Sequence, residues 1–165
     1  MALLNNLLNN LVDALASRAG WKRPRQDENG AYCFRLENGL DFLLFSPDER
    51  VCILRAELAD VPASGPDREE MLRAAARRQA GICRTRASVA ALEKPGQSLL
   101  KSVSGPGDRL VLYRMAELDA GQEAFDATVR DFLNDLAWWK AASGGSGQHA
   151  ARSFFGMPGM FGGIY

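Results

Sequence analysis

The chain is poor in the residues on which most catalytic and metal sites depend. It has a single histidine, His149, which follows a stretch of glycine and serine. A histidine-based catalytic triad or a zinc site requires an imidazole held by a rigid framework. The sequence also has no GxGxxG and no Walker-type phosphate-binding motif. We therefore expect no enzyme activity, no catalytic residue, no metal site and no cofactor.

An excess of charge of one sign is lacking as well. The 20 lysines and arginines balance the 20 aspartates and glutamates, whereas binding to nucleic acid or to a membrane surface usually requires a basic excess. No apolar run is long enough, at about 18 residues, to span a membrane. The N-terminus has no basic segment of the kind that begins a signal peptide. These absences predict a cytoplasmic protein that neither binds nucleic acid nor inserts into membranes.

Cysteines are few and are not paired in the sequence. Cys33, Cys52 and Cys83 are scattered, odd in number and form no CxxC motif. This usage indicates a reducing compartment rather than a disulfide framework. We expect all three thiols to be buried or partly buried, as small apolar residues are.

The residues that are present predict a helix followed by three strands. Leucines recur about every four residues between positions 2 and 19, separated by asparagines, which is typical of an amphipathic helix. Strands are expected at 31–36, 39–46 and 50–58, with Asn38-Gly39 as a hairpin turn. The third strand is apolar on both faces, which is typical of a strand inside a covered sheet.

The second half predicts a helix, further strands and a closing helix. Asp67 and Glu70 have the spacing of a capping box, so a helix is expected from Asp67 to about Ala80. Strands are expected at 86–93, 97–103 and 109–118, and a long amphipathic helix at 119–142. The fold class is therefore α+β: helix, three strands, helix, two or three strands, helix, with a twisted, mostly antiparallel sheet packed by helices.

The composition divides the chain into two parts. Residues 1–142 form the α+β domain, and residues 143–165 read as a Gly-rich flexible tail that contains large apolar residues. One interpretation of the tail is a disordered end. The other is a peptide that docks on an apolar groove, either of this protein or of a partner. The apolar residues of the domain also exceed the needs of one small sheet, which permits a dimer interface, a peptide-binding groove or both.

Several strings, in this order, resemble the class I type III secretion chaperones, the Tir chaperone family. The resemblance spans about residues 3–142. The strings are the leucine-rich opening helix, Tyr32-Cys33-Phe34-Arg35-Leu36 with the Asn38-Gly39 turn, Val51–Leu58 with Val61-Pro62, Arg68–Ala76, Arg109–Tyr113 with Leu118-Asp119, and finally Phe125, Phe132, Leu136 and Trp138-Trp139.

This resemblance implies a homodimer of the bacterial cytoplasm that binds the N-terminal segment of a secreted effector. It would keep that segment non-globular and aid its delivery to the export apparatus during virulence-associated secretion. The export ATPase is a further partner compatible with that role. The second helix would form the dimer contact through Met71, Leu72 and Ala75. The first helix and the sheet would hold the effector through a set of apolar side chains, namely Leu4, Leu8, Phe34, Phe42 and Leu44.

The chain departs from the family in three ways. Members are usually acidic, whereas this chain has a sequence pI of about 6.6. The stretch Lys94–Asp108 is longer than the family's turn, and the tail lies outside the pattern. Two alternatives stay open: a partner-switching regulator on the same fold that sequesters a regulatory protein, and a small enzyme with a polar cleft that the sequence does not reveal.

Overall fold

The computed structural model describes residues 4–37, 39–48, 50–96 and 106–143. The predicted strand at 97–103 and the tail from residue 144 lie outside these residues. The described elements follow in the order α1 (Leu4–Ala19), β1 (Tyr32–Arg35), β2 (Asp41–Phe45), β3 (Val51–Asp60), α2 (Pro66–Ile82), β4 (Val89–Glu93), β5 (Arg109–Glu117) and α3 (Gln122–Ser143).

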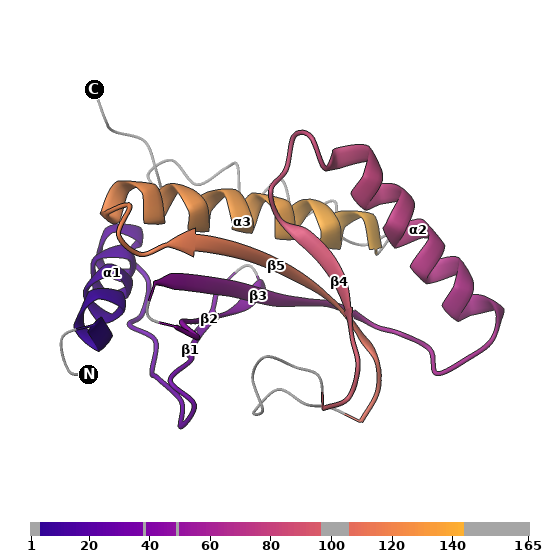
Figure 1. The fold of residues 1–165 in the computed structure, drawn as a ribbon, viewed down its shortest axis with the longest axis horizontal. Coiled ribbons are helices and arrows are strands. Elements are labelled where there is room, and N and C mark those ends of the chain that lie inside the picture. Colours follow the sequence, from indigo (N-terminus) through magenta and orange to yellow (C-terminus); the bar gives the residue numbers. More distant parts are fainter. Residues whose placement is uncertain (1–3, 38, 49, 97–105, 144–165) are drawn as a thin grey trace.

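The strands form one five-stranded sheet in the order β1-β2-β3-β5-β4, and every neighbouring pair is antiparallel. The long β3 pairs with β5 from Val51–Glu117 to Asp60–Arg109, with a register shift between Glu57 and Ala59. The predicted α+β class and the antiparallel sheet are confirmed. Figure 1 shows the twist of the sheet, with β4 crossing over at one edge.

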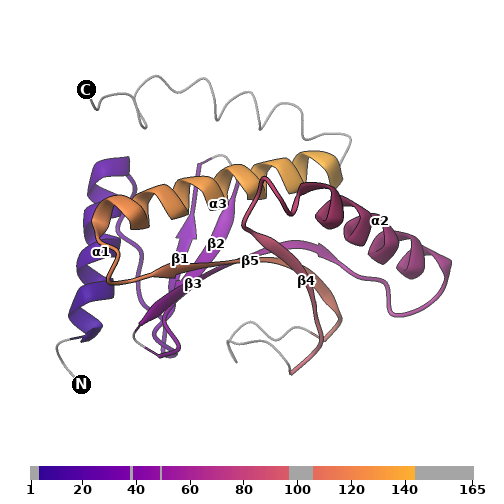
Figure 2. The same cartoon turned by 45° about the horizontal axis from the view of Figure 1, so that its top comes forward.

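α1 and α3 cover one face of the sheet, which we call the covered face (Figures 1 and 2). Alternate residues of each strand point to this face. Gln122 of α3 donates to the Leu11 carbonyl at 3.1 Å, and Arg18 of α1 pairs with Asp126 at 2.9 Å, so the two helices are tied to each other. The core between helices and sheet includes Leu11, Val12, Leu15, Phe34, Phe42, Leu44, Leu54, Leu112, Phe125, Val129, Phe132 and Leu136.

α2 is much less buried than the other two helices. None of its residues is buried, and it lies beside the β4 edge of the sheet rather than over a face (Figure 1). Its start also differs from the prediction, because the N-cap is Gly65, in the left-handed region at φ 91°, and no side chain caps the helix. Pro66 in the first turn sets a helical φ, so Asp67 and Glu70 do not form the expected capping box.

The C-terminal end of α2 is joined to α3 by a charged junction. Arg78 and Arg86 lie over the Trp138 ring, 5.0 and 5.2 Å from its centroid. Asp135 of α3 accepts hydrogen bonds from Arg86 at 2.6 Å and from Ser88 at 2.5 Å. The residues 86–88 that were expected to begin a strand serve this junction, and β4 begins at Val89.

The cysteine prediction is confirmed for one residue and wrong for two. Cys52 is buried in the core, and burial raises the pKa of its thiol to about 12. Cys33 and Cys83 are exposed, because they lie on the uncovered side of β1 and just beyond α2. None of the helices among the described residues has the length and apolar character needed to cross a membrane.

Candidate partner-binding surfaces

The face of the sheet opposite α1 and α3, which we call the open face, is not covered by a helix of the described residues (Figure 2). Its side chains come from the positions that alternate with the core. Phe45, Ile53 and Met115 lie in one row across β2, β3 and β5. Leu43, Arg55, Tyr113 and Val89 lie in the next row.

Two large apolar side chains on this face are strongly exposed. They are Met115 at 65% and Val89 at 52%, the exposed large hydrophobic residues of the described chain. Val89 is opposite Tyr113, so Met115 is its diagonal neighbour on the same face, a spacing that long side chains bridge. Ile53 and Leu43 are half-buried beside them and pack on the buried Phe45. We call Leu43, Phe45, Ile53, Val89 and Met115 the open-face patch.

A polar network borders this patch. The Arg55 guanidinium is only 1% exposed and binds both carboxylate oxygens of Glu93, through Nε at 3.0 Å and through Nη2 at 2.7 Å. The Tyr113 hydroxyl also donates to Glu93, and Arg109 donates to Glu57. Two arginines face two carboxylates, so the network is neutral, and it links β3, β5 and β4 across the sheet.

The surroundings of this network keep Tyr113 and Arg55 protonated, because the pKa of each is raised. Burial raises the pKa of Tyr113 to about 12, and the hydrogen bond to Glu93 acts in the same direction. Burial alone would lower the pKa of Arg55, but the hydrogen bond and the charge of Glu93 outweigh it and raise that pKa. The network is therefore a fixed structural border and not an acid–base pair poised near neutral pH.

The outer edge of β4 is closed by one side chain of α2. The Ala90 amide donates to Gln79 Oε1 at 2.8 Å, and Gln79 Nε2 donates to the Ser88 carbonyl at 3.4 Å. The primary amide of Gln79 thus takes the place of a peptide group in a neighbouring strand. An edge strand covered in this way is protected against pairing with other chains.

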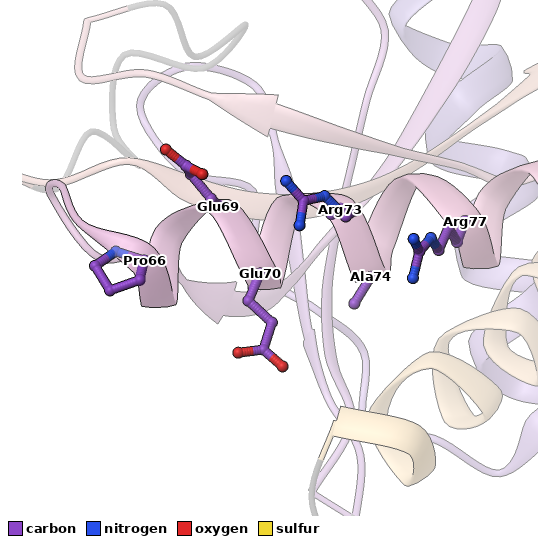
Figure 3. A pocket seen from close by; sticks show the side chains of 6 residues that line it. All are labelled: Pro66, Glu69, Glu70, Arg73, Ala74 and Arg77. Carbon is purple, nitrogen blue, oxygen red and sulfur yellow. The ribbon is translucent and has the colours of Figure 1, made fainter.

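The outward side of α2 carries a second surface, a shallow hollow of about 390 Å³. Figure 3 shows its lining side chains along successive turns of the helix: Pro66, Glu69, Glu70, Arg73, Ala74 and Arg77. The two acids precede the two arginines. An antiparallel pair of such helices would bring the acidic half of each opposite the basic half of the other, so this surface is complementary to itself.

A second hollow, of about 380 Å³, lies at the charged junction between residues 85–87, β5 and α3. Its charged side chains already bind one another: Arg86 contacts Asp135, and Arg114 contacts Asp131 at 3.5 Å and Asp135 at 3.7 Å. No group of histidine, cysteine and carboxylate side chains with the geometry of a metal site occurs among the described residues.

The residues predicted to hold an effector lie elsewhere. Four of them, Leu8, Phe34, Phe42 and Leu44, are buried in the core of the covered face. In this structure their side chains are therefore not accessible to a partner. Phe34 stacks on Phe42 with ring centroids 4.7 Å apart, and the Trp21 ring lies edge-on to Phe34 at 5.8 Å. The side chain of Leu4 lies outside the described part of the chain. The predicted residues of β1 and β2 are thus the inward ones, and the outward residues of β2 are Leu43 and Phe45.

The residues predicted for the dimer, Met71, Leu72 and Ala75, lie on the side of α2 that turns toward the rest of the chain. All three are half-buried, and Ala75 packs against the core. The charged stripe of Figure 3 is on the opposite side of the helix. Sequence reasoning missed Val89 and Met115. The available signal was the alternation of β5, in which Val111, Tyr113 and Met115 share one face.

No protein-family model matches the chain, and no curated protein matches its sequence. The fold, however, is shared with solved structures. The ExsC–ExsE complex contains a chain that matches with a TM-score of 0.58 and 20% identity, over 86% of this chain and 96% of that one.

Two further structures show the same fold. The HopA1–SchA chaperone–effector complex matches with a TM-score of 0.55 and 12% identity, over 86% of this chain and 98% of that one. The Yersinia pestis type III secretion chaperone SycH, in complex with a stable fragment of YscM2, matches with a TM-score of 0.52 and 10% identity, over 81% and 96%. The chain thus has the fold found in type III secretion chaperones.

Proposed function

We propose that the protein is a type III secretion chaperone that binds an N-terminal segment of a secreted effector and keeps it non-globular for export. The observation that supports this most directly is the open-face patch, where Met115 and Val89 expose apolar surface on a sheet that is otherwise well packed. Exposed apolar surface of this kind on a small domain marks a site for a protein partner.

The mechanism requires only binding energy. A partner segment that becomes ordered loses about 1–2 kcal/mol of conformational entropy per fixed residue. Burial of apolar side chains returns about 25 cal/mol for each Å² removed from water. The neutral network around Arg55 and Glu93 leaves no unpaired charge under a bound segment, so a partner can cover it without a large desolvation cost. Neither a nucleotide nor a metal is needed.

This proposal is tested by native mass spectrometry of the protein isolated from its own cytosol, with each co-purified polypeptide sequenced. We expect a complex of two chains with one copy of a secreted protein. The identified polypeptide is then expressed separately and titrated calorimetrically against the purified chain. A regulatory protein in place of a secreted one would instead support the partner-switching alternative, and a chain isolated without any bound protein would contradict both.

The calorimetric titration also locates the site. Met115→Asp places a carboxylate in the patch, and we expect it to weaken partner binding by at least about tenfold, because a buried unpaired charge is costly. Ala124→Asp is the matched control, since residue 124 is exposed near the start of α3. Equal affinities for the two variants would place the partner elsewhere.

We further propose that two copies associate through α2. No residue of α2 is buried within one chain, and its outward side is exposed, so a second copy can cover that side. Met71, Leu72 and Ala75 face the rest of the chain and would not form this pairing. The hollow in Figure 3 has an acidic half followed by a basic half, which suits an antiparallel pairing of two such helices. A two-fold axis through this contact would produce an interface of the same residues from both chains.

The dimer is tested by reversing the charges of α2 in two steps. R73E/R77E leaves the charged residues of the hollow all acidic, and we expect it to shift the protein from about 36 kDa, twice the 18.0 kDa chain, to the monomer in analytical ultracentrifugation. Adding E69R/E70R restores complementarity with the polarity exchanged and should restore the dimer. A dimer that survives the first step, or that the second step does not rescue, would exclude this pairing.

A further inference from the structure

We propose that the open-face patch is also the docking site of the chain's own C-terminal segment, residues 153–161, which covers the patch when no partner is bound. The inference concerns the regulation of the surface to which the proposed function assigns the partner, and it rests on that function only for its effect on partner affinity. The docking itself is a property of the isolated chain.

The surface requires an occupant that is apolar and uncharged. Met115 and Val89 are diagonal neighbours, Ile53 lies directly opposite Met115 on β3, and Phe45 lies opposite Ile53 on β2. Together these four side chains form a continuous apolar strip across four strands. Of the charges that border it, those on Arg55 and Glu93 are paired with each other, and the exposed Glu117 lies beside Met115 at the end of β5. An occupant that is apolar and carries no acidic group therefore suits this strip.

The C-terminal segment has the matching composition. From Ser153 to Tyr165 the sequence contains no charged residue, and it includes Phe154, Phe155, Met157, Met160 and Phe161. Aromatic and methionine side chains contribute large apolar area and adapt to irregular surfaces. The glycines between them let a peptide backbone approach a sheet closely.

The point at which the segment leaves the domain favours this surface. Asp135 of α3 contacts Ser88 at 2.5 Å, and Ser88 directly precedes the exposed Val89 at the edge of the sheet. Ser143, where α3 ends, is eight residues past Asp135, or about 12 Å along the helix axis. Eleven further residues reach Phe154 and span up to about 40 Å when extended. This length is well above the distance from Ser143 back to Asp135, whose contact Ser88 directly precedes Val89.

Because the segment belongs to the same chain, even a weak contact is sufficient for it to occupy the patch most of the time. A short linker gives a tethered ligand an effective concentration in the millimolar range. If the segment covers the patch for nine-tenths of the time, the apparent affinity of a competing partner falls about tenfold. The hollow on α2 is a poor alternative for this segment, because it is lined by Glu69, Glu70, Arg73 and Arg77.

The test is methyl NMR of the full-length chain with isotope-labelled methionine. Met115 reports on the patch, and Met71 on α2 is an internal control in the same spectrum. We expect contacts between the Met115 methyl and aromatic ring protons, and a shift of the Met115 resonance toward its free-peptide value in F154S/F155S/F161S. The matched variant Q148S/H149S, altered only before the apolar segment, should leave Met115 unchanged. In every variant Met71 should stay in place.

Two results would overturn the inference. One is a Met115 resonance that does not respond to F154S/F155S/F161S, which means that the segment does not contact the patch. The other is a response that disappears on dilution, which means that the occupant is the segment of a second copy. Neither result bears on the proposed function, which fails if the protein is isolated without any bound polypeptide. If the segment docks on the patch and the partner binds there too, F154S/F155S/F161S should bind that partner about tenfold more tightly than the unaltered chain.

Discussion

The two faces of the sheet are built from the same strands and yet serve different ends. On the covered face, Phe42, Leu44 and Leu54 are buried under two helices of the same chain. On the open face, the residues between them pack into a small patch and a neutral polar network, and Met115 and Val89 remain exposed. The covered face therefore supplies most of the stability, and the open face carries the surface available to a partner.

The largest expected effect on stability is on the covered face. Phe132 of α3 is fully buried and its ring lies 6.0 Å from that of Phe42. Phe132→Ala should lower the free energy of unfolding by about 3–5 kcal/mol, because it removes apolar contact and leaves a cavity. Urea denaturation followed by circular dichroism measures this change. A loss as small as that of a surface substitution would mean that α3 does not form the core.

An intermediate effect is expected where the open face is buried. Arg55→Ala removes the arginine that binds both oxygens of the buried Glu93 carboxylate. We expect a loss of about 3 kcal/mol in the same denaturation experiment, since breaking a buried ion pair from one side is strongly destabilising. Arg35→Ala, at an exposed position on the same face, is the control. Equal losses of unfolding free energy in the two variants would show that the buried network does not stabilise the fold.

The smallest effect on stability is expected from the patch itself. Met115→Asp alters a side chain that is already 65% exposed, so the free energy of unfolding should change by less than about 0.5 kcal/mol. The same substitution is expected to weaken partner binding strongly. A substitution on the open face should thus affect binding and not stability, whereas one on the covered face should affect stability. A Met115→Asp variant that unfolds readily would contradict this difference between the two faces.

The sequence predicted the fold well because the elements have clear periods. The leucine spacing of α1 and the apolar stripe of α3 both correspond to helices that are buried on one side, and β1 and β2 pair antiparallel as expected of a hairpin. These signals are local, since each depends on residues within a few turns or within one strand. The strand at 97–103 stays a prediction.

The candidate site was harder to predict, for reasons that particular residues show. Phe42, Leu43, Leu44 and Phe45 are all apolar, so the composition of β2 does not reveal which pair faces the helices. That choice depends on where α1 and α3 lie, which is a tertiary property. The pairing of Arg55 with Glu93 joins residues 38 positions apart, and no single strand contains a signal for it.

The amide of Gln79 has a consequence for the rate at which the sheet can open. A strand at the edge of a sheet is released only when a ladder of hydrogen bonds breaks, which is a local unfolding event that takes microseconds or longer. The β4 edge is instead closed at Ser88 and Ala90 by one side chain. Changes of side-chain rotamer are many orders of magnitude faster than local unfolding. This part of the molecule can therefore exchange one hydrogen-bonding neighbour for another without unfolding any of its helices or strands.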